Sequence, residues 1–320
     1  MYKMEYRRLI SFGKSSFVVS LPKEWINQNT LKKGDLVYLQ ESGPNLLLSK
    51  KENDEKGEER EKIIYVDGKS AYTIEREVCS TYIQNYPRII LRGKEIKNKV
   101  KELQGIVQSL IALEIMEQTS DTIIAKDFLN MDSVSVEELI RKMDLVTRTM
   151  MKETQQIFDE DNYESLNERD QDVNRLYFLL YRSILYNLRN PMKALRNFKL
   201  SGLDLLRAHF IGFYIEAIAD EVRRTARHAH TLKMPVQTQQ QLQQYLVKMY
   251  DYYTGTMKAA YNKDAELAFK QAELKRSFDQ ELEALEAEVQ KIPGFNRVLT
   301  RMLRMTSLIH NLGRVLYTMQ

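Results

Sequence analysis

The sequence of 320 residues has a single cysteine, Cys79, and no long apolar run. One thiol cannot form an intrachain disulfide or a cysteine-based zinc site. No stretch approaches the roughly 18–20 apolar residues that cross a bilayer. The first residues also lack the apolar core of a secretory signal. These absences predict a cytoplasmic protein without membrane insertion.

Motifs of the common catalytic sites are missing as well. The sequence contains no glycine-rich phosphate loop, no His-Glu-x-x-His and no Gly-x-Ser-x-Gly nucleophile turn. Those patterns place a phosphate cradle, a zinc site or an activated serine at a fixed position in the fold. Since none is present, we expect that the protein is not an enzyme.

The positive charge of the chain is concentrated near its beginning. Residues 1–50 carry eight basic and four acidic side chains, and the whole chain has a formal net charge of +4. A local excess of Lys and Arg is what a phosphate-contacting surface requires. Basic side chains also decorate exposed strand edges that contact nothing.

The candidate DNA contacts share a location in the first 23 residues. Arginines there can reach phosphates or base edges, and serine hydroxyls can hold phosphate oxygens. We place the arginines on a first strand, the next three residues at a turn, and the last at a helix start. The candidates are Arg7, Arg8, Lys14, Ser15, Ser16 and Lys23.

Residues 1–50 predict a very small β-module. Two short strands flank the turn Phe12–Ser15, a helical turn follows Pro22, and two further strands complete the segment. Four strands and one helical turn cannot bury a sufficient core alone. We therefore expect the module to pair with a second copy of itself.

The order of residues in this module adds a resemblance. The segment RRLISFGKSSFVVSLPKEWINQNTLKKGDLVYLQESGPNLLLS resembles the SpoVT/AbrB (MazE-like) swapped-hairpin family. The resemblance implies a homodimer whose chains interlock their hairpins into one β-barrel, which binds DNA through basic residues of strand and turn. The matching residues are Arg8, Gly13, Lys14, Ser15, Leu21, Pro22, Lys23, Trp25, Leu31, Gly34 and Asp35.

The rest of the sequence predicts three further parts, so the fold class is multidomain α+β. Residues 49–62 are densely charged, contain no aliphatic or aromatic side chain and read as a linker. Strand and helix patterns alternate over 63–132, which predicts a small α/β connector. Six long helical patterns with short connections follow, and they group as two three-helix bundles over 133–235 and 236–320.

Acidic residues lie at helical spacing in the first of these bundles. Glu216 and Asp220 are four residues apart, as are Asp170 and Asn174 on the preceding helix. Oxygen ligands from facing helices can form a metal site. Alternatively, Asp220 pairs with an arginine one turn further along its own helix.

These helices carry a second resemblance. FIGFYIEAIADEVRRTARHA and ERDQDVNRLYFLLYRSI resemble the acidic helices of PhoU-like proteins, and the fused β-module is typical of archaeal PhoU-related phosphate-uptake regulators. The resemblance implies a divalent, iron or zinc ion at Glu216, Asp220 and Asp170. However, Asn174 stands where the family has a second acid. In the second half, Thr306 and His310 replace the acidic pair, so we expect one metal site at most.

Together these patterns predict a dimeric DNA-binding transcriptional regulator. Its helical body would sense or relay a signal in phosphate-uptake control, through a metal or through a phosphate-transporter subunit or signalling protein. The alternative is an interaction module that does not bind DNA. Its helical body would dock on such a partner, and its β-module would serve for dimerisation.

Overall fold

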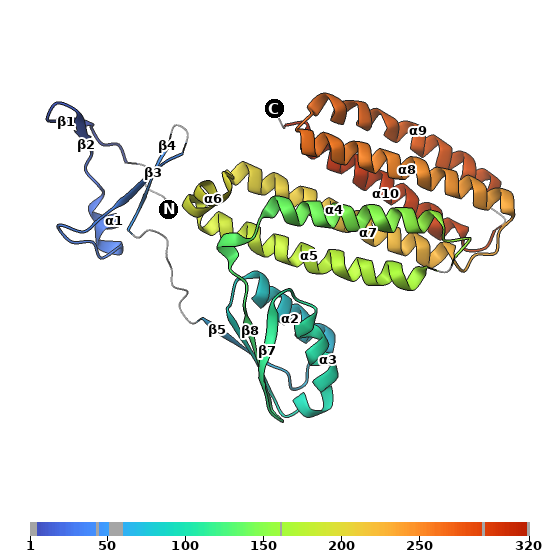
Figure 1. Ribbon diagram of the computed structural model, residues 1–320, viewed down its shortest axis with the longest axis horizontal. Helices are drawn as coiled ribbons and strands as arrows, with labels where there is room; N and C mark the ends of the chain where they lie inside the picture. The colour runs from blue at the N-terminus through green and yellow to red at the C-terminus, as the bar shows by residue number, and fades with distance from the viewer. Residues whose placement is uncertain (1–4, 43–44, 51–59, 161, 290–291, 319–320) are drawn as a thin grey trace. The chain divides into compact units, whose positions relative to one another are not determined.

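The computed structural model describes residues 5–42, 45–50, 60–160, 162–289 and 292–318. The chain divides into two compact units, Met1–Lys56 and Gly57–Gln320 (Figure 1). The first unit carries short strands and the second is largely helical, so the protein is multidomain. Residues 51–59 of the predicted linker lie outside the described residues.

The first unit consists of two antiparallel hairpins and one short helix. The first hairpin turns at Gly13, whose φ of +71° is left-handed and therefore suits glycine. The predicted strand pairs are both present. The elements are β1 (Ile10–Phe12), β2 (Ser16–Val18), α1 (Lys23–Gln28), β3 (Tyr38–Ser42) and β4 (Asn45–Ser49).

The described residues of this unit form no core of their own. Its hairpins form separate two-stranded sheets, and no side chain described within residues 5–50 is buried. Isolated two-stranded hairpins are at best marginally stable in water. Many large apolar side chains are more than half exposed, namely Leu9, Ile10, Phe12, Phe17, Leu36, Leu39 and Leu46.

The second unit begins with an α/β layer pair. Its four-stranded sheet has the order β5-β6-β8-β7, with β5 parallel to β6 and the other neighbours antiparallel. Both helices pack on the strands and on each other, around a buried apolar cluster. The elements are β5 (Glu61–Tyr65), α2 (Ala71–Ile83), β6 (Arg88–Arg92), α3 (Ile96–Gln108), β7 (Leu113–Gln118) and β8 (Thr122–Asp127).

Strand β7 begins inside an apolar run of the sequence and not at the start of that run. The apolar run that begins at Leu110 reads as a strand, but β7 begins only at Leu113. Ala112 has a φ of +60°, a left-handed conformation that no extended strand contains. The first residues of the run therefore close the turn after α3 instead of entering the sheet.

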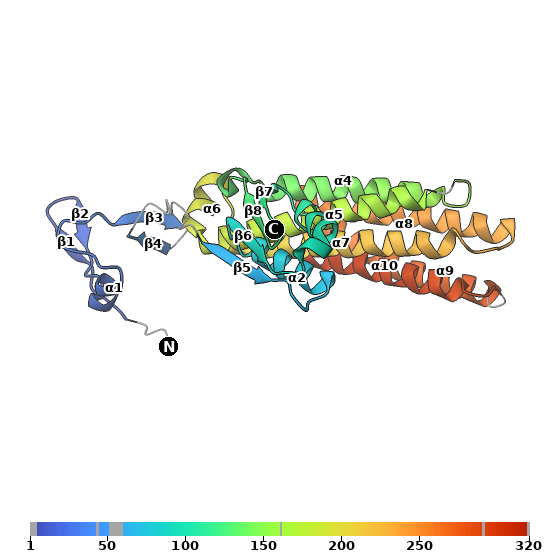
Figure 2. The same cartoon turned by 90° about the horizontal axis from the view of Figure 1, so that it is seen from below.

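In the described part of residues 133–318, seven α-helices form the helical body (Figures 1 and 2). Helices α4, α5 and α7 pack on one another, as do α8, α9 and α10. Contacts of α7 with α10 and of α4 with α8 join the two groups. The helices are α4 (Val136–Gln155), α5 (Tyr163–Arg189), α6 (Pro191–Phe198), α7 (Gly202–Ala229), α8 (Val236–Asn262), α9 (Ala265–Val289) and α10 (Phe295–Leu316).

The six predicted long helices are present, and α6 is an addition. In the sequence, Asn190-Pro191 indicates the end of a helix, whereas Pro191 also begins α6. Proline is favoured in the first turn of a helix because its missing N–H has no intrahelical partner there. Next, Ser201 and Asp204 form a reciprocal capping box that begins α7. Among the described helices, none has the length and apolarity to cross a membrane.

A buried arginine joins the α/β layers to the helical body. Arg182 of α5 is 2% exposed and pairs with Asp127 at the end of β8. Its Nε donates to Oδ1 of Asn85 at 2.8 Å, and its guanidinium lies 4.4 Å from the ring centroid of Tyr82. Because a buried charge requires partners, these contacts fix α5 against the α/β layers.

Candidate nucleic-acid interface

Four of the six candidate DNA contacts lie on the first hairpin and at the start of α1, and the other two, Arg7 and Arg8, precede the hairpin. Every one of the six side chains is exposed. Lys14 and Ser15 form the tip of the β1–β2 turn, Ser16 is the first residue of β2, and Lys23 is the first residue of α1. A short tip with a lysine, hydroxyls and backbone N–H groups has the donors that phosphate oxygens accept.

Arg7 and Arg8 lie outside the strand on which the sequence places them. The pairing of β1 with β2 begins at Ile10 opposite Val18, so both arginines precede β1. Beyond Val18 the chain approaches Pro22, which has no N–H for a ladder hydrogen bond. The arginines therefore precede the hairpin, in a segment without regular secondary structure.

Three of the candidate cations have no ion-pair partner among the described residues. Arg7 pairs with Glu5, two residues earlier. Arg8, Lys14 and Lys23 form no such pair within the described part of the chain. Arg8 and Lys14 are thus available to an external anion, whereas Arg7 would have to exchange its carboxylate partner.

The turn before β3 explains part of the sequence motif. Asp35 accepts a hydrogen bond from the backbone N–H of Lys32 at 2.8 Å, and Gly34 has a φ of +96°. The Gly-Asp pair therefore holds the chain reversal that leads into β3. Lys32 and Lys33 are exposed at this turn. The sequence motif includes Gly34 and Asp35, but it does not identify Lys32 and Lys33 as candidate DNA contacts.

The comparison with protein families bears on this module. Residues 10–56 match a family model. It is the model described as antidote-toxin recognition MazE, bacterial antitoxin. No curated protein and no solved structure matches the chain. The match confirms the MazE-like part of the resemblance over these residues. The PhoU-like interpretation of the helical body stays a prediction.

The candidate metal ligands lie together, but arginines lie among them. Arg223 Nε is 2.9 Å from Oδ2 of Asp170, and its Nη2 donates to Oδ1 of Asp220 at 2.8 Å. Arg224 pairs with Asp220 at 2.6 Å. Asp170 of α5 and Asp220 of α7 thus both pair with the guanidinium of Arg223. This arrangement is the ion-pair alternative to a metal site.

Glu216 is the third member of this acidic group and makes no ion pair among the described residues. Burial, reinforced by the charges of Asp220 and Asp170, raises the pKa of Glu216 from 4.5 to about 7. Asn174 donates to Asp170 at 3.3 Å. Within the described residues, no group of three or more His, Cys, Asp or Glu side chains could hold a metal ion. As folded, the two aspartates of the acidic group therefore pair with the guanidinium groups of Arg223 and Arg224.

In the second group of helices, the positions that correspond to Glu216 and Asp220 are Thr306 and His310, which are not acidic. Thr306 is buried, and its hydroxyl donates to the carbonyl of Leu303 at 2.9 Å on its own helix. Burial lowers the pKa of His310, helped by the positive charges of Lys275 and Arg314. Lys275 in turn pairs with Asp279. This face of the second group therefore contains an ion pair and a neutral imidazole.

Proposed function

We propose that the protein is a dimeric DNA-binding transcriptional regulator that acts by binding and not by catalysis. The observation that carries the proposal is the MazE match over 10–56, on a hairpin whose tip exposes Lys14, a cation without an ion-pair partner among the described residues. Arg8 and Lys14 would contact phosphates or base edges, and Ser15 and Ser16 would hold phosphate oxygens.

Dimerisation is part of the proposal because the module has no core. Its exposed apolar side chains include Phe12 and Phe17, at 69% and 66%. Packing both hairpins against those of a second copy, as in the swapped-hairpin barrels that the module resembles, would bury these side chains. A two-fold dimer also presents two copies of the basic tip, which suits a DNA site with two half-sites.

The helical body is proposed to sense or relay the signal, in the manner of the PhoU-like proteins that it resembles. Support comes from its six long helices in two packed groups and from the acidic motifs on α5 and α7. Phosphate-uptake control, and a transporter subunit or signalling protein as partner, follow from that resemblance alone.

A second candidate function is a docking module that does not bind DNA. An exposed apolar stripe on α7 favours it: Leu203, Leu206, Phe210 and Phe213 recur three or four residues apart and are 42–54% exposed. Contiguous exposed apolar surface commonly marks a protein-interaction site. In this alternative the β-module would serve only to pair two bodies.

Binding of DNA separates the two functions. Fluorescence anisotropy of a labelled duplex pool with the full-length protein should show binding at low salt, with affinity that falls steeply as salt increases. Arg8→Ala/Lys14→Ala removes four cations from a dimer, so it should weaken binding at least about tenfold and flatten the salt slope by about 4. Lys97→Ala/Lys101→Ala, exposed on α3, removes the same charge elsewhere and is the control. Absence of binding by the wild-type dimer at low salt would favour the docking module.

A further inference from the structure

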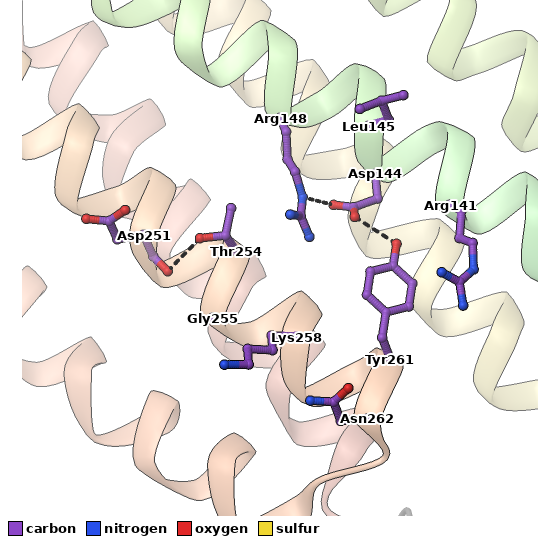
Figure 3. A pocket seen from close by; sticks show the side chains of 10 residues that line it. All are labelled: Arg141, Asp144, Leu145, Arg148, Asp251, Thr254, Gly255, Lys258, Tyr261 and Asn262. Atoms are coloured by element: carbon purple, nitrogen blue, oxygen red, sulfur yellow. Dashed lines mark hydrogen bonds and ion pairs between the residues drawn. The ribbon is translucent and has the colours of Figure 1, made fainter.

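A hollow of about 740 Å³ lies between α4 and α8, where the two groups of helices meet (Figure 3). Residues three and four apart on each helix line it, so one stripe of α4 faces one stripe of α8. Its volume falls within the roughly 300–1,000 Å³ of small-molecule sites. The lining comprises Arg141, Asp144, Leu145, Arg148, Asp251, Thr254, Gly255, Lys258, Tyr261 and Asn262.

The only carboxylate on the α4 side of this lining is already neutralised. Asp144 is 6% exposed, accepts from Nε of Arg148 at 2.9 Å and accepts from the Tyr261 hydroxyl at 2.7 Å. Figure 3 shows these three side chains meeting between the helices. Because both carboxylate oxygens are engaged, Asp144 fixes the orientation of Arg148 and would not repel an incoming anion as a free carboxylate would.

The remaining cationic atoms are free to bind an anion. Only Nε of Arg148 takes part in its bond to Asp144, so the two terminal nitrogens of the guanidinium form no hydrogen bond among the described residues. Lys258 has no ion-pair partner there either. Arg141 lies 5.0 Å from the centroid of the Tyr261 ring and shares its charge with exposed Glu137. A guanidinium fork and an ammonium that line the same hollow suit the oxygens of a phosphate group.

The other side of the hollow has a different chemistry. Asp251 makes no ion pair among the described residues, and Asn262 offers an amide. Thr254 donates to the Asp251 carbonyl at 3.1 Å and keeps its acceptor lone pairs. A free carboxylate and an amide favour hydroxyl groups on a ligand and disfavour a second anionic group. The hollow is also larger than a lone phosphate requires.

Gly255 lies in the lining for a reason of packing. A Cβ at this position would lie 2.7–2.8 Å from the side-chain amide of Gln271 on α9. The glycine is therefore explained by the packing of α8 on α9. Leu145 and the ring of Tyr261 supply the apolar surface of the hollow.

We propose that this hollow binds a small phosphorylated polyol, such as a sugar phosphate or a ribonucleotide. The phosphate lies against Arg148 and Lys258, and hydroxyl groups of the ligand donate to Asp251. The proposal goes beyond DNA binding and does not depend on it, because the residues belong to the helical body and not to the β-module.

Isothermal titration of the full-length protein tests the proposal with ribose 5-phosphate, AMP, inorganic phosphate and ribose as separate ligands. At least one of the two organic phosphates should bind saturably, inorganic phosphate more weakly, and ribose not measurably. Inorganic phosphate binding as tightly as both organic phosphates would overturn the polyol part of the proposal. No saturable binding of either organic phosphate would overturn all of it.

Variants then locate the site. Lys258→Ala and Arg148→Lys should each weaken binding about tenfold or more, the second because lysine keeps the charge beside Asp144 but loses the fork. Lys142→Ala, exposed on α4 outside the lining, should leave the affinity unchanged. Lys258 is exposed, so its variant is informative even if Arg148→Lys does not fold. Equal losses in Lys258→Ala and Lys142→Ala would overturn the assignment, as would loss of binding in Arg8→Ala/Lys14→Ala.

Discussion

Arg182 on α5 donates through Nε to Oδ1 of Asn85 at 2.8 Å, although 97 positions separate the two residues. Asn85 follows α2 and has a φ of +63°, which asparagine tolerates better than most residues. The same guanidinium pairs with Asp127. A single buried side chain therefore connects the helical body to two separate segments of the α/β layers.

Loss of this side chain should destabilise the second unit strongly. Arg182→Met leaves Asp127 buried without its counter-charge, which typically costs about 3–5 kcal/mol of unfolding free energy. Urea denaturation followed by far-UV circular dichroism measures the change. Arg189→Met is the control: Arg189 is exposed at the end of the same helix, where its side chain donates to the carbonyl of Gln84, and about 0.5 kcal/mol is expected. Equal effects of the two substitutions would contradict a special role for Arg182.

Glu216 should make stability depend on pH. Its folded pKa of about 7 lies above its ordinary value of 4.5, so the folded state binds the proton more tightly. Stability should therefore fall as pH rises from about 4.5 to 7 and level off above that range. Glu216→Gln removes the buried charge and should be more stable than the wild type at pH 8 by about 3 kcal/mol, with little difference near pH 4.5. Denaturation midpoints across this pH range are the measurement.

The control for that series is Glu168→Gln, an exposed position on α5. Its pH profile should follow the wild type. Identical profiles of Glu216→Gln and the wild type would refute the buried-carboxylate interpretation.

Elemental analysis of the same preparations tests the metal prediction directly. A stoichiometric metal that is lost in Glu216→Gln would show that Arg223 moves away from the acids.

The same substitution at two helical glycines should have opposite effects. At Gly212 of α7 a Cβ would lie 2.2 Å from Cδ2 of Leu180, a side chain with no exposed surface on α5. Gly212→Ala should therefore cost about 1–3 kcal/mol through overpacking. Nothing lies within 4 Å of a Cβ at Gly105 of α3, so Gly105→Ala should stabilise by about 0.5–1 kcal/mol. Thermal denaturation of both variants tests the pair, and a stabilised Gly212→Ala would mean that the two helices can separate slightly.

The dimer proposal makes its own prediction at Phe17. This side chain is 66% exposed on β2, and its burial in a barrel would contribute about 1.5–3 kcal/mol per chain. Phe17→Glu should raise the dimer dissociation constant at least about hundredfold without melting the helical body. Sedimentation velocity over a concentration series gives the constant. Val247→Glu, at an exposed position of α8, should leave it unchanged.

Local patterns predicted the elements well and the long-range contacts poorly. Hydrophobic periodicity and turn residues were sufficient for the hairpins and the six long helices. They missed α6, because Pro191 follows one helix and begins the next. The contact of Arg182 with Asn85 has no local signal, since it depends on how α5 packs against layers almost a hundred residues earlier.

In the candidate sites, too, local features were predictable from the sequence and long-range features were not. The basic residues of the hairpin are exposed, as their charges suggested, but the position of Arg7 and Arg8 before β1 depends on where strand pairing ends. The acidic spacing on α7 was visible in the sequence, and so was the alternative that Arg223 or Arg224 neutralises it. The hollow between α4 and α8 had no signal, because its two stripes lie about a hundred residues apart.

The lack of a core in the described residues of the first unit has a consequence for how DNA binding would depend on the concentration of the protein. A segment that gains its core only from a second chain has a folding free energy that depends on chain concentration. If the proposed dimer is the form that binds DNA, the fraction of paired modules would fall at low expression, and DNA-competent molecules would increase with roughly the square of the chain concentration. A modest change in synthesis or degradation would then produce a larger change in occupied DNA, without any change in the affinity of the assembled dimer.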